Sequence, residues 1–106
     1  MAIKDVMSEL SDVLQKNMAK NKGMSGVYQF ELSGEEPLDF YIKLSDGVPE
    51  VVEGKADSPS ITVSMSGSDF LGLKNGTLNA MSAFMGGKLK VKGDMSLAMK
   101  LESLIK

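Results

Sequence analysis

The chain has 106 residues, a net charge of −2 and a hydrophobic content of 42%, values that suit one globular domain over residues 1–106. It contains neither cysteine nor histidine, which excludes disulfides, thiol chemistry, zinc sites and acid–base catalysis by histidine. All of its basic residues are lysine, and we expect no nucleic-acid partner because such surfaces are normally rich in arginine. Its nine methionines fit either a surface that accepts varied apolar shapes or an ordinary core in which methionine replaces leucine.

The first half of the chain predicts one helix followed by four strands. Apolar residues recur at helical spacing from Ile3 to about Lys20, and glycine at position 23 helps to end that helix. Apolar runs and alternations then predict strands, separated by turn sequences. The predicted strands cover residues 27–32, 38–44, 48–53 and 61–65.

Two short helices are predicted next, each marked by a capping residue. Ser66 has the side chain and the position of an N-cap, and the helix after it is predicted to stop at Asn75 and Gly76. Asn79 is the predicted N-cap of a second helix over residues 80–85, which two glycines end.

The C-terminal part predicts a strand and a last helix. Residues 88–92 alternate strictly, and their three lysines are typical of a protected edge strand. Asp94 is the predicted N-cap of a helix over residues 95–105. Met95 and Met99 widen the apolar stripe of that helix beyond what one contact surface needs.

No residue pattern indicates a catalytic or metal site. Glu35 and Glu36 are expected in a solvated turn, and the chain has neither a calcium-binding loop nor a nucleophile elbow. Ser82 and Lys88 lack any supporting signature of a Ser–Lys dyad. We therefore expect no catalytic residue, no metal and no cofactor.

The stretch from Gly76 to Leu101, GTLNAMSAFMGGKLKVKGDMSLAMKL, closely resembles the sterol-carrier-protein-2 (SCP2) sterol-binding family. The upstream sequence ITVSMS, followed by Asp69 and Phe70, is also similar to the family. The predicted order of elements agrees with the family along essentially the whole chain. The similarity is concentrated in four motifs: SAF at 82–84, GKLK at 87–90, GD at 93–94 and LAMKL at 97–101.

The resemblance implies an α+β fold with a twisted, five-stranded, mostly antiparallel sheet covered by helices. It also implies an apolar tunnel between the sheet and the C-terminal helices, holding a fatty acid, a fatty acyl-CoA, a sterol, a phospholipid or another long apolar ligand. By position in the family pattern, the tunnel is expected to be lined by Phe70, Leu71, Leu73, Met81, Phe84, Met85, Met95, Met99, Leu101 and Leu104.

Two departures from the family pattern affect this expectation. Ala80 stands where the family often has proline, which would loosen the turn before the short helix. The chain ends in Leu104, Ile105 and Lys106, which is not a peroxisomal signal, and it starts without a signal-peptide pattern. We therefore expect a cytoplasmic location and, in a prokaryote, acyl chains in preference to sterol.

The leading hypothesis is a non-enzymatic carrier that binds and transfers a lipid, with transient membrane contact. The alternative is an accessory protein-interaction module whose core is filled by its own side chains. A third hypothesis is an acyl hydrolase that uses Ser82. Lys16, Lys20 or Gln15 would meet a lipid head group, and the sequence leaves a monomer and a weak dimer both open.

Overall fold

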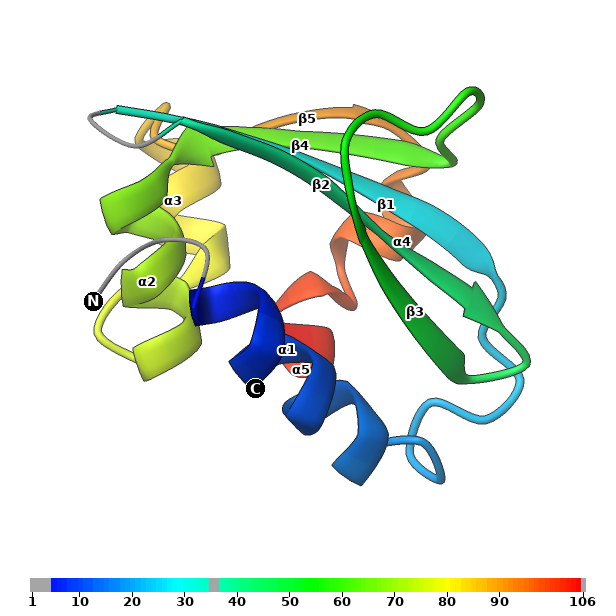
Figure 1. Cartoon of the computed structure of the whole chain (residues 1–106). Coiled ribbons are helices and arrows are strands. Elements are labelled where there is room, and N and C mark those ends of the chain that lie inside the picture. The colour runs from blue at the N-terminus through cyan, green and yellow to red at the C-terminus, as the bar shows by residue number, and fades with distance from the viewer. Residues whose placement is uncertain (1–4, 35–36, 106) are drawn as a thin grey trace.

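The computed structural model describes residues 5–34 and 37–105, and it places the helices on one face of an open sheet (Figure 1). Along the sequence, one helix is followed by four strands. Two helices then precede the fifth strand, and two more follow it. The elements are α1 (Asp5–Lys16), β1 (Gly26–Ser33), β2 (Leu38–Ser45), β3 (Val48–Glu53), β4 (Ile61–Ser66), α2 (Gly67–Asn75), α3 (Ala80–Met85), β5 (Lys90–Gly93), α4 (Met95–Ala98) and α5 (Leu101–Ile105).

The five strands form one sheet in the order β3-β2-β1-β4-β5. Neighbouring strands run antiparallel, except that β1 and β4 are parallel. Phe30 at the centre of β1 lies opposite Phe40 of β2 and Val63 of β4. The predicted α+β class and the mostly antiparallel five-stranded sheet are thereby confirmed, and β5 lies at the edge that its lysines predicted.

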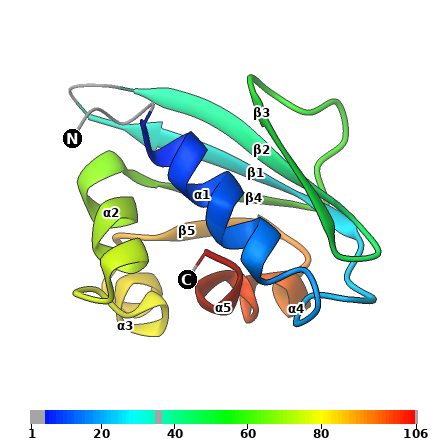
Figure 2. The ribbon, with the colours of Figure 1, turned by 60° about the horizontal axis from the view of Figure 1, so that its bottom comes forward.

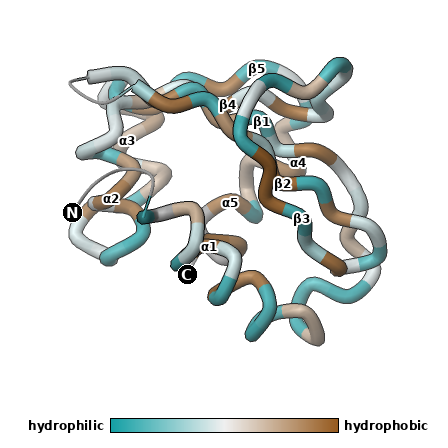
Figure 3. The backbone as a smooth tube through the Cα atoms, in the orientation of Figure 1, coloured by the Kyte–Doolittle hydropathy of each residue, from teal (hydrophilic) through white to brown (hydrophobic). Residues whose placement is uncertain are grey.

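Alternation along the strands sorts the side chains to the two faces of the sheet, and it appears as alternating brown and teal in Figure 3. The apolar face packs against the helices, which lie together on one side of the sheet in Figure 2. Phe30 and Phe40 stack with ring centroids 4.9 Å apart, and Phe70 of α2 meets their rings edge-on at 5.5 and 5.8 Å. This aromatic cluster fixes α2 on the centre of the sheet.

On the face of the sheet that the helices do not cover, the side chain of Gln29 forms hydrogen bonds with the connection between β3 and β4. Its side-chain amide nitrogen donates to the carbonyls of Phe40 (3.0 Å) and Gly54 (3.1 Å), and its amide oxygen accepts from the backbone N–H of Ala56 (2.7 Å). The residue is only 2% exposed, so these bonds satisfy a buried polar group. The connection leads to β4, which must pair parallel to β1.

The predicted single helix over residues 95–105 is wrong, because the chain forms α4 and α5 with a turn between them. The carbonyl of Leu97 accepts from the hydroxyl of Tyr28 (2.8 Å) and from the backbone N–H of Lys100 (3.1 Å). The bond to Lys100 spans three residues, which tightens the turn and interrupts the regular ladder of the α-helix. A tertiary hydrogen bond thus accompanies the break.

The bounds of two other elements differ from the prediction. The strand predicted over 88–92 begins only at Lys90, because the backbone N–H groups of Lys88 and Leu89 both donate to the carbonyl of Ala83. The first helix ends at Lys16, earlier than the predicted end near Lys20, and tight turns follow it. Its predicted start at Ile3 lies outside the described residues.

Candidate functional site

The helix α3 forms one wall of the candidate site, and its two ends are set by local sequence. The side chain of Asn79 accepts from the backbone N–H of Ser82 (3.2 Å), as predicted for an N-cap. Gly86 is the C-cap, and the backbone N–H groups of Lys88 and Leu89 donate to the carbonyl of Ala83. These bonds keep α3 to six residues and return the chain to the sheet edge at β5.

The opposite wall is α4. Its N-terminus is held by a capping side chain and by a backbone hydrogen bond to the residue before β4. The carboxylate of Asp94 accepts from the backbone N–H of Ser96 (2.9 Å) and from its hydroxyl (2.6 Å), which confirms the predicted cap. The N–H of Asp94 donates to the carbonyl of Ser60 (3.0 Å). Gly93 has a φ of +121°, and a Cβ there would lie 2.6 Å from the same carbonyl oxygen. Only glycine fits this close approach.

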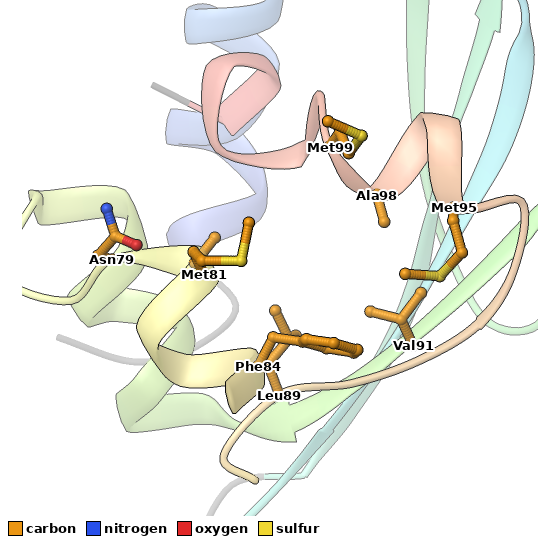
Figure 4. A pocket seen from close by; sticks show the side chains of 9 residues that line it. Asn79, Met81, Phe84, Leu89, Val91, Met95, Ala98 and Met99 are labelled. Carbon is orange, nitrogen blue, oxygen red and sulfur yellow. The ribbon is translucent and has the colours of Figure 1, made fainter. Parts of the chain in front are cut away.

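An apolar pocket lies between these two helices, with β5 as its floor (Figure 4). Its volume is about 390 Å³, which falls in the range of small-molecule sites. Eight of the nine lining residues are apolar, and they come from α3, β5, the residue before β5 and the α4–α5 region. The lining is Asn79, Ala80, Met81, Phe84, Leu89, Val91, Met95, Ala98 and Met99.

The rim of the pocket is open to solvent. Met81 is 61% exposed, Met95 is 49% exposed and Met99 is 81% exposed. Phe84 is 44% exposed, and its ring points across the gap toward Val91 and Met95 in Figure 4. Single exposed apolar side chains are common on protein surfaces, but several of them around one cavity are informative.

The ten predicted lining residues fall into two groups in the structure. Met81, Phe84, Met95 and Met99 line the pocket. The other six do not line it: Phe70, Leu73, Leu101 and Leu104 are fully buried in the core, Leu71 is half-buried and Met85 is 79% exposed. The enclosed tunnel itself stays a prediction.

Five lining residues were not among the predicted ones: Asn79, Ala80, Leu89, Val91 and Ala98. A signal for two of them was present, because the lysines of the edge strand alternate with Leu89 and Val91 and leave these on the opposite face. Ala80 and Ala98 have small side chains, and whether they line a cavity depends on the orientation of α3 and α4. The sequence contains no signal for that orientation.

Two titratable groups next to α4 are perturbed. Burial, together with the negative charge of Asp94, raises the pKa of Tyr28 to about 12. Hydrogen bonds from the side chain and backbone of Ser96 lower the pKa of Asp94, and the positive charge of Lys100 adds to this shift. Both shifts favour the protonation states that hold α4: a neutral tyrosine and an ionised cap.

Polar residues contribute little to the pocket. Lys16, Lys20 and Gln15, the predicted head-group contacts, are not lining residues, and that role stays a prediction. Ser82 is exposed on α3 and is also outside the lining. Among residues 5–34 and 37–105, no three acidic side chains gather closely enough to hold a metal ion. Over the same residues, no helix has the length and apolar character required to span a bilayer.

Comparison with known proteins identifies the family of the chain. A model described as the SCP-2 sterol transfer family matches residues 7–106. Hydroxysteroid dehydrogenase-like protein 2 of Xenopus tropicalis is 41% identical over 85 residues, which are 79% of this chain and 20% of that relative. The chain thus spans about a fifth of the length of this relative, and the name belongs to that longer protein.

Solved structures share the fold over almost the whole chain. The palmitated sterol carrier protein 2 like 2 of Aedes aegypti superposes with a TM-score of 0.81 at 22% identity, covering 99% of this chain and 95% of that one. The sterol carrier protein domain 2 of Helicoverpa armigera superposes with a TM-score of 0.74 at 30% identity, covering 92% of this chain and 80% of that one.

Proposed function

Because the chain belongs to the SCP-2 sterol transfer family, we propose that it binds one long-chain lipid in the pocket between α3 and α4 and transfers it chemically unchanged. The observation that carries the proposal is the apolar pocket of about 390 Å³, to which Asn79 adds the one polar lining residue. Such a lining selects for hydrocarbon and offers a single amide to a polar end. The tail of a fatty acid or acyl-CoA is the ligand we favour.

Two further observations support a lipid cargo. The palmitated relative of Aedes aegypti has the same fold, and its ligand is a saturated acyl chain. Methionines supply three of the nine lining residues, Met81, Met95 and Met99. Their flexible thioether side chains adapt to different apolar shapes, which suits a carrier that accepts several acyl chains.

The expected affinity follows from the buried hydrocarbon. Burying about fourteen methylenes contributes on the order of 11 kcal/mol at ~0.8 kcal/mol each. Association itself costs at least ~4 kcal/mol, which leaves a dissociation constant that is roughly micromolar. Such binding keeps a lipid in solution and still releases it, as transfer requires.

The proposal is tested with a fluorescent fatty acid and two glutamate variants of α3. Met81→Glu places a carboxylate in the pocket wall, where it would be desolvated by the acyl chain, and we expect binding to weaken at least ~10-fold. Met85→Glu is the matched control, because Met85 lies on the same helix, is 79% exposed and does not line the pocket. Equal effects of both variants would contradict the proposed site.

A second pair of variants tests the volume of the pocket. Ala98→Phe adds a ring where the wall is made of a single methyl group, and we expect it to compete with the acyl chain and abolish uptake. Ala19→Phe is its control, since Ala19 is exposed in the turns after α1. Circular dichroism of both variants confirms folding before binding is compared.

The accessory-module alternative predicts a different result. A folded wild-type protein that carries no co-purified lipid and takes up no fatty acid would favour a partner-binding role instead. Turnover of an acyl ester that disappears in Ser82→Ala would favour the hydrolase. Cytoplasmic location and the choice between monomer and weak dimer stay predictions, for which cell fractionation and sedimentation are the measurements.

A further inference from the structure

Exposed apolar side chains are concentrated around the mouth of the pocket. Among the described residues, six large hydrophobic side chains are exposed, and five of them lie on α3 or along residues 95–99. Clustered exposure of this kind marks an interaction surface. We call this cluster the mouth surface, and it consists of Met81, Phe84, Met85, Met95 and Met99.

The mouth surface is larger than the ligand pocket requires. Met85 is 79% exposed, yet it is not a lining residue, so contact with a bound acyl chain does not explain it. Met99 lines the pocket but leaves 81% of its surface exposed. These two side chains project from the two walls of the pocket and are available to a partner outside the molecule.

Positive charge is concentrated in the part of the sequence that contains the mouth surface. Residues 76–101 contain four lysines and one acidic residue, a net charge of +3, whereas the rest of the chain has eight lysines and thirteen acidic residues, a net charge of −5. Lys88, Lys90, Lys92 and Lys100 are all exposed.

Two of these lysines lie next to the mouth surface. Lys100 directly follows Met99 between α4 and α5, and Lys88 follows the end of α3. Lys90 and Lys92 alternate with the pocket-lining Leu89 and Val91, so they project from the opposite face of the same edge strand. Positive charge beside exposed methionine and phenylalanine is complementary to a bilayer, whose head groups are negatively charged and whose interior is apolar.

We propose that the mouth surface docks on an anionic lipid bilayer, with the opening of the pocket facing the membrane. The apolar side chains enter the boundary between head groups and acyl chains while the lysines contact anionic head groups. The acidic remainder of the chain is repelled by the same surface, which orients the molecule. This inference rests on the proposed function, because it supplies the route by which an acyl chain enters the pocket.

Helix α1 fits this role less well. Its exposed face includes Asp5 and Asp12 as well as Lys16, so it has no excess of positive charge. A membrane-surface helix normally carries a polar face rich in lysine or arginine. The structure therefore favours contact through the mouth surface.

The first test measures co-sedimentation with sucrose-loaded vesicles of phosphatidylcholine alone and of phosphatidylcholine with phosphatidylserine. We expect binding to the anionic vesicles that decreases with salt, and at least ~10-fold weaker binding to neutral vesicles. Lys88→Gln/Lys100→Gln should weaken binding to anionic vesicles by ~10-fold or more. Lys22→Gln/Lys43→Gln changes the net charge equally at exposed sites of the acidic remainder and should reduce binding less than ~3-fold.

The second test separates docking from ligand binding. Met85→Ser should weaken vesicle binding and slow transfer of a fluorescent fatty acid from vesicles, while its affinity for the same fatty acid in solution stays that of the wild type. Val48→Ser, at an exposed residue of β3, is the control. If wild-type protein binds no fatty acid in solution, the proposed function fails, whereas docking is still decided by co-sedimentation.

Three results would overturn the docking proposal. The first is absence of vesicle binding, and the second is equal loss of binding in the two lysine pairs. The third is concentration-dependent self-association that Met85→Ser abolishes, which would show that a second copy of this chain covers the mouth surface.

Discussion

The hydrogen bond from Tyr28 to Leu97 predicts a specific dependence of stability on pH. The hydroxyl donates to the carbonyl of Leu97 at 2.8 Å and ties β1 to α4. Removing it in Tyr28→Phe should lower the free energy of unfolding by about 1 kcal/mol at pH 8, since the carbonyl keeps its bond from Lys100.

The same hydroxyl makes the wild type sensitive to alkali. Its pKa is about 12 in the folded chain, raised from 10.0, so the unfolded state loses the proton first as pH rises. Stability due to this group is complete below pH 10 and is lost between pH 10 and 12. At pH 11 the linkage relation gives a loss of about 1.4 kcal/mol relative to Tyr28→Phe. The advantage of the wild type at pH 8 should therefore vanish near pH 11.

Urea denaturation followed by far-UV circular dichroism, at intervals from pH 8 to 11, measures this crossover. Comparing the wild type with Tyr28→Phe cancels the titration of lysines, which both proteins share. Tyr41→Phe, which removes the hydroxyl of a half-buried tyrosine of β2, is the control for the loss of a tyrosine hydroxyl in general. A gap between the wild type and Tyr28→Phe that keeps its size from pH 8 to 11 would refute the reasoning.

Three further predictions concern residues that position the site and the core. Gly93→Ala should destabilise the protein more than Gly54→Ala in urea denaturation, because both glycines have a φ near +120° but only a Cβ at Gly93 meets backbone, at 2.6 Å. Asp94→Ala should make the stability of the protein less sensitive to acid, as measured by a pH titration followed by circular dichroism. The pKa of this carboxyl is lowered in the folded chain. The stability that the ionised carboxylate contributes is therefore present above the ordinary pKa of an aspartate and is lost as the pH falls through the folded pKa. Phe70→Ala should cost ~3–5 kcal/mol by denaturation, whereas Phe84→Ala, at a 44% exposed side chain, should cost much less.

Local patterns were sufficient to predict the strands and the helix caps. Alternation from Leu38 to Leu44 predicted β2, and both of these residues are buried with the apolar residues between them. Ser66, Asn79 and Asp94 each accept the backbone N–H expected of an N-cap. These features depend on residues a few positions apart, so the sequence contains the information directly.

The break after Ala98 could not be predicted in the same way. Met95, Met99 and Leu101 form one apolar stripe in sequence, and nothing local ends the helix between them. The break coincides with a hydrogen bond from Tyr28, which is 69 residues away from Leu97 along the chain. It sends Leu101 into the core and leaves both methionines on the pocket, so residues of one stripe in the sequence lie in different surroundings.

The pocket exists because the edge of the sheet receives less helical cover than its centre. The same alternation places Phe30, Val63 and Val91 on one face, yet Phe30 and Val63 are completely buried and Val91 is only partly so. Helix α2 packs on β1 and β4 at the centre of the sheet, whereas β5 packs against α4, which has four residues, and the six-residue α3 lies across the pocket from α4. Side chains on these two short helices therefore meet the cavity instead of a packed layer. Substitutions at the rim of the pocket should therefore weaken ligand binding with little loss of stability. Substitutions in the core under α2 should lower stability with little direct effect on ligand binding. Measuring ligand binding and denaturation for both classes tests whether different residues on this face of the sheet determine function and folding.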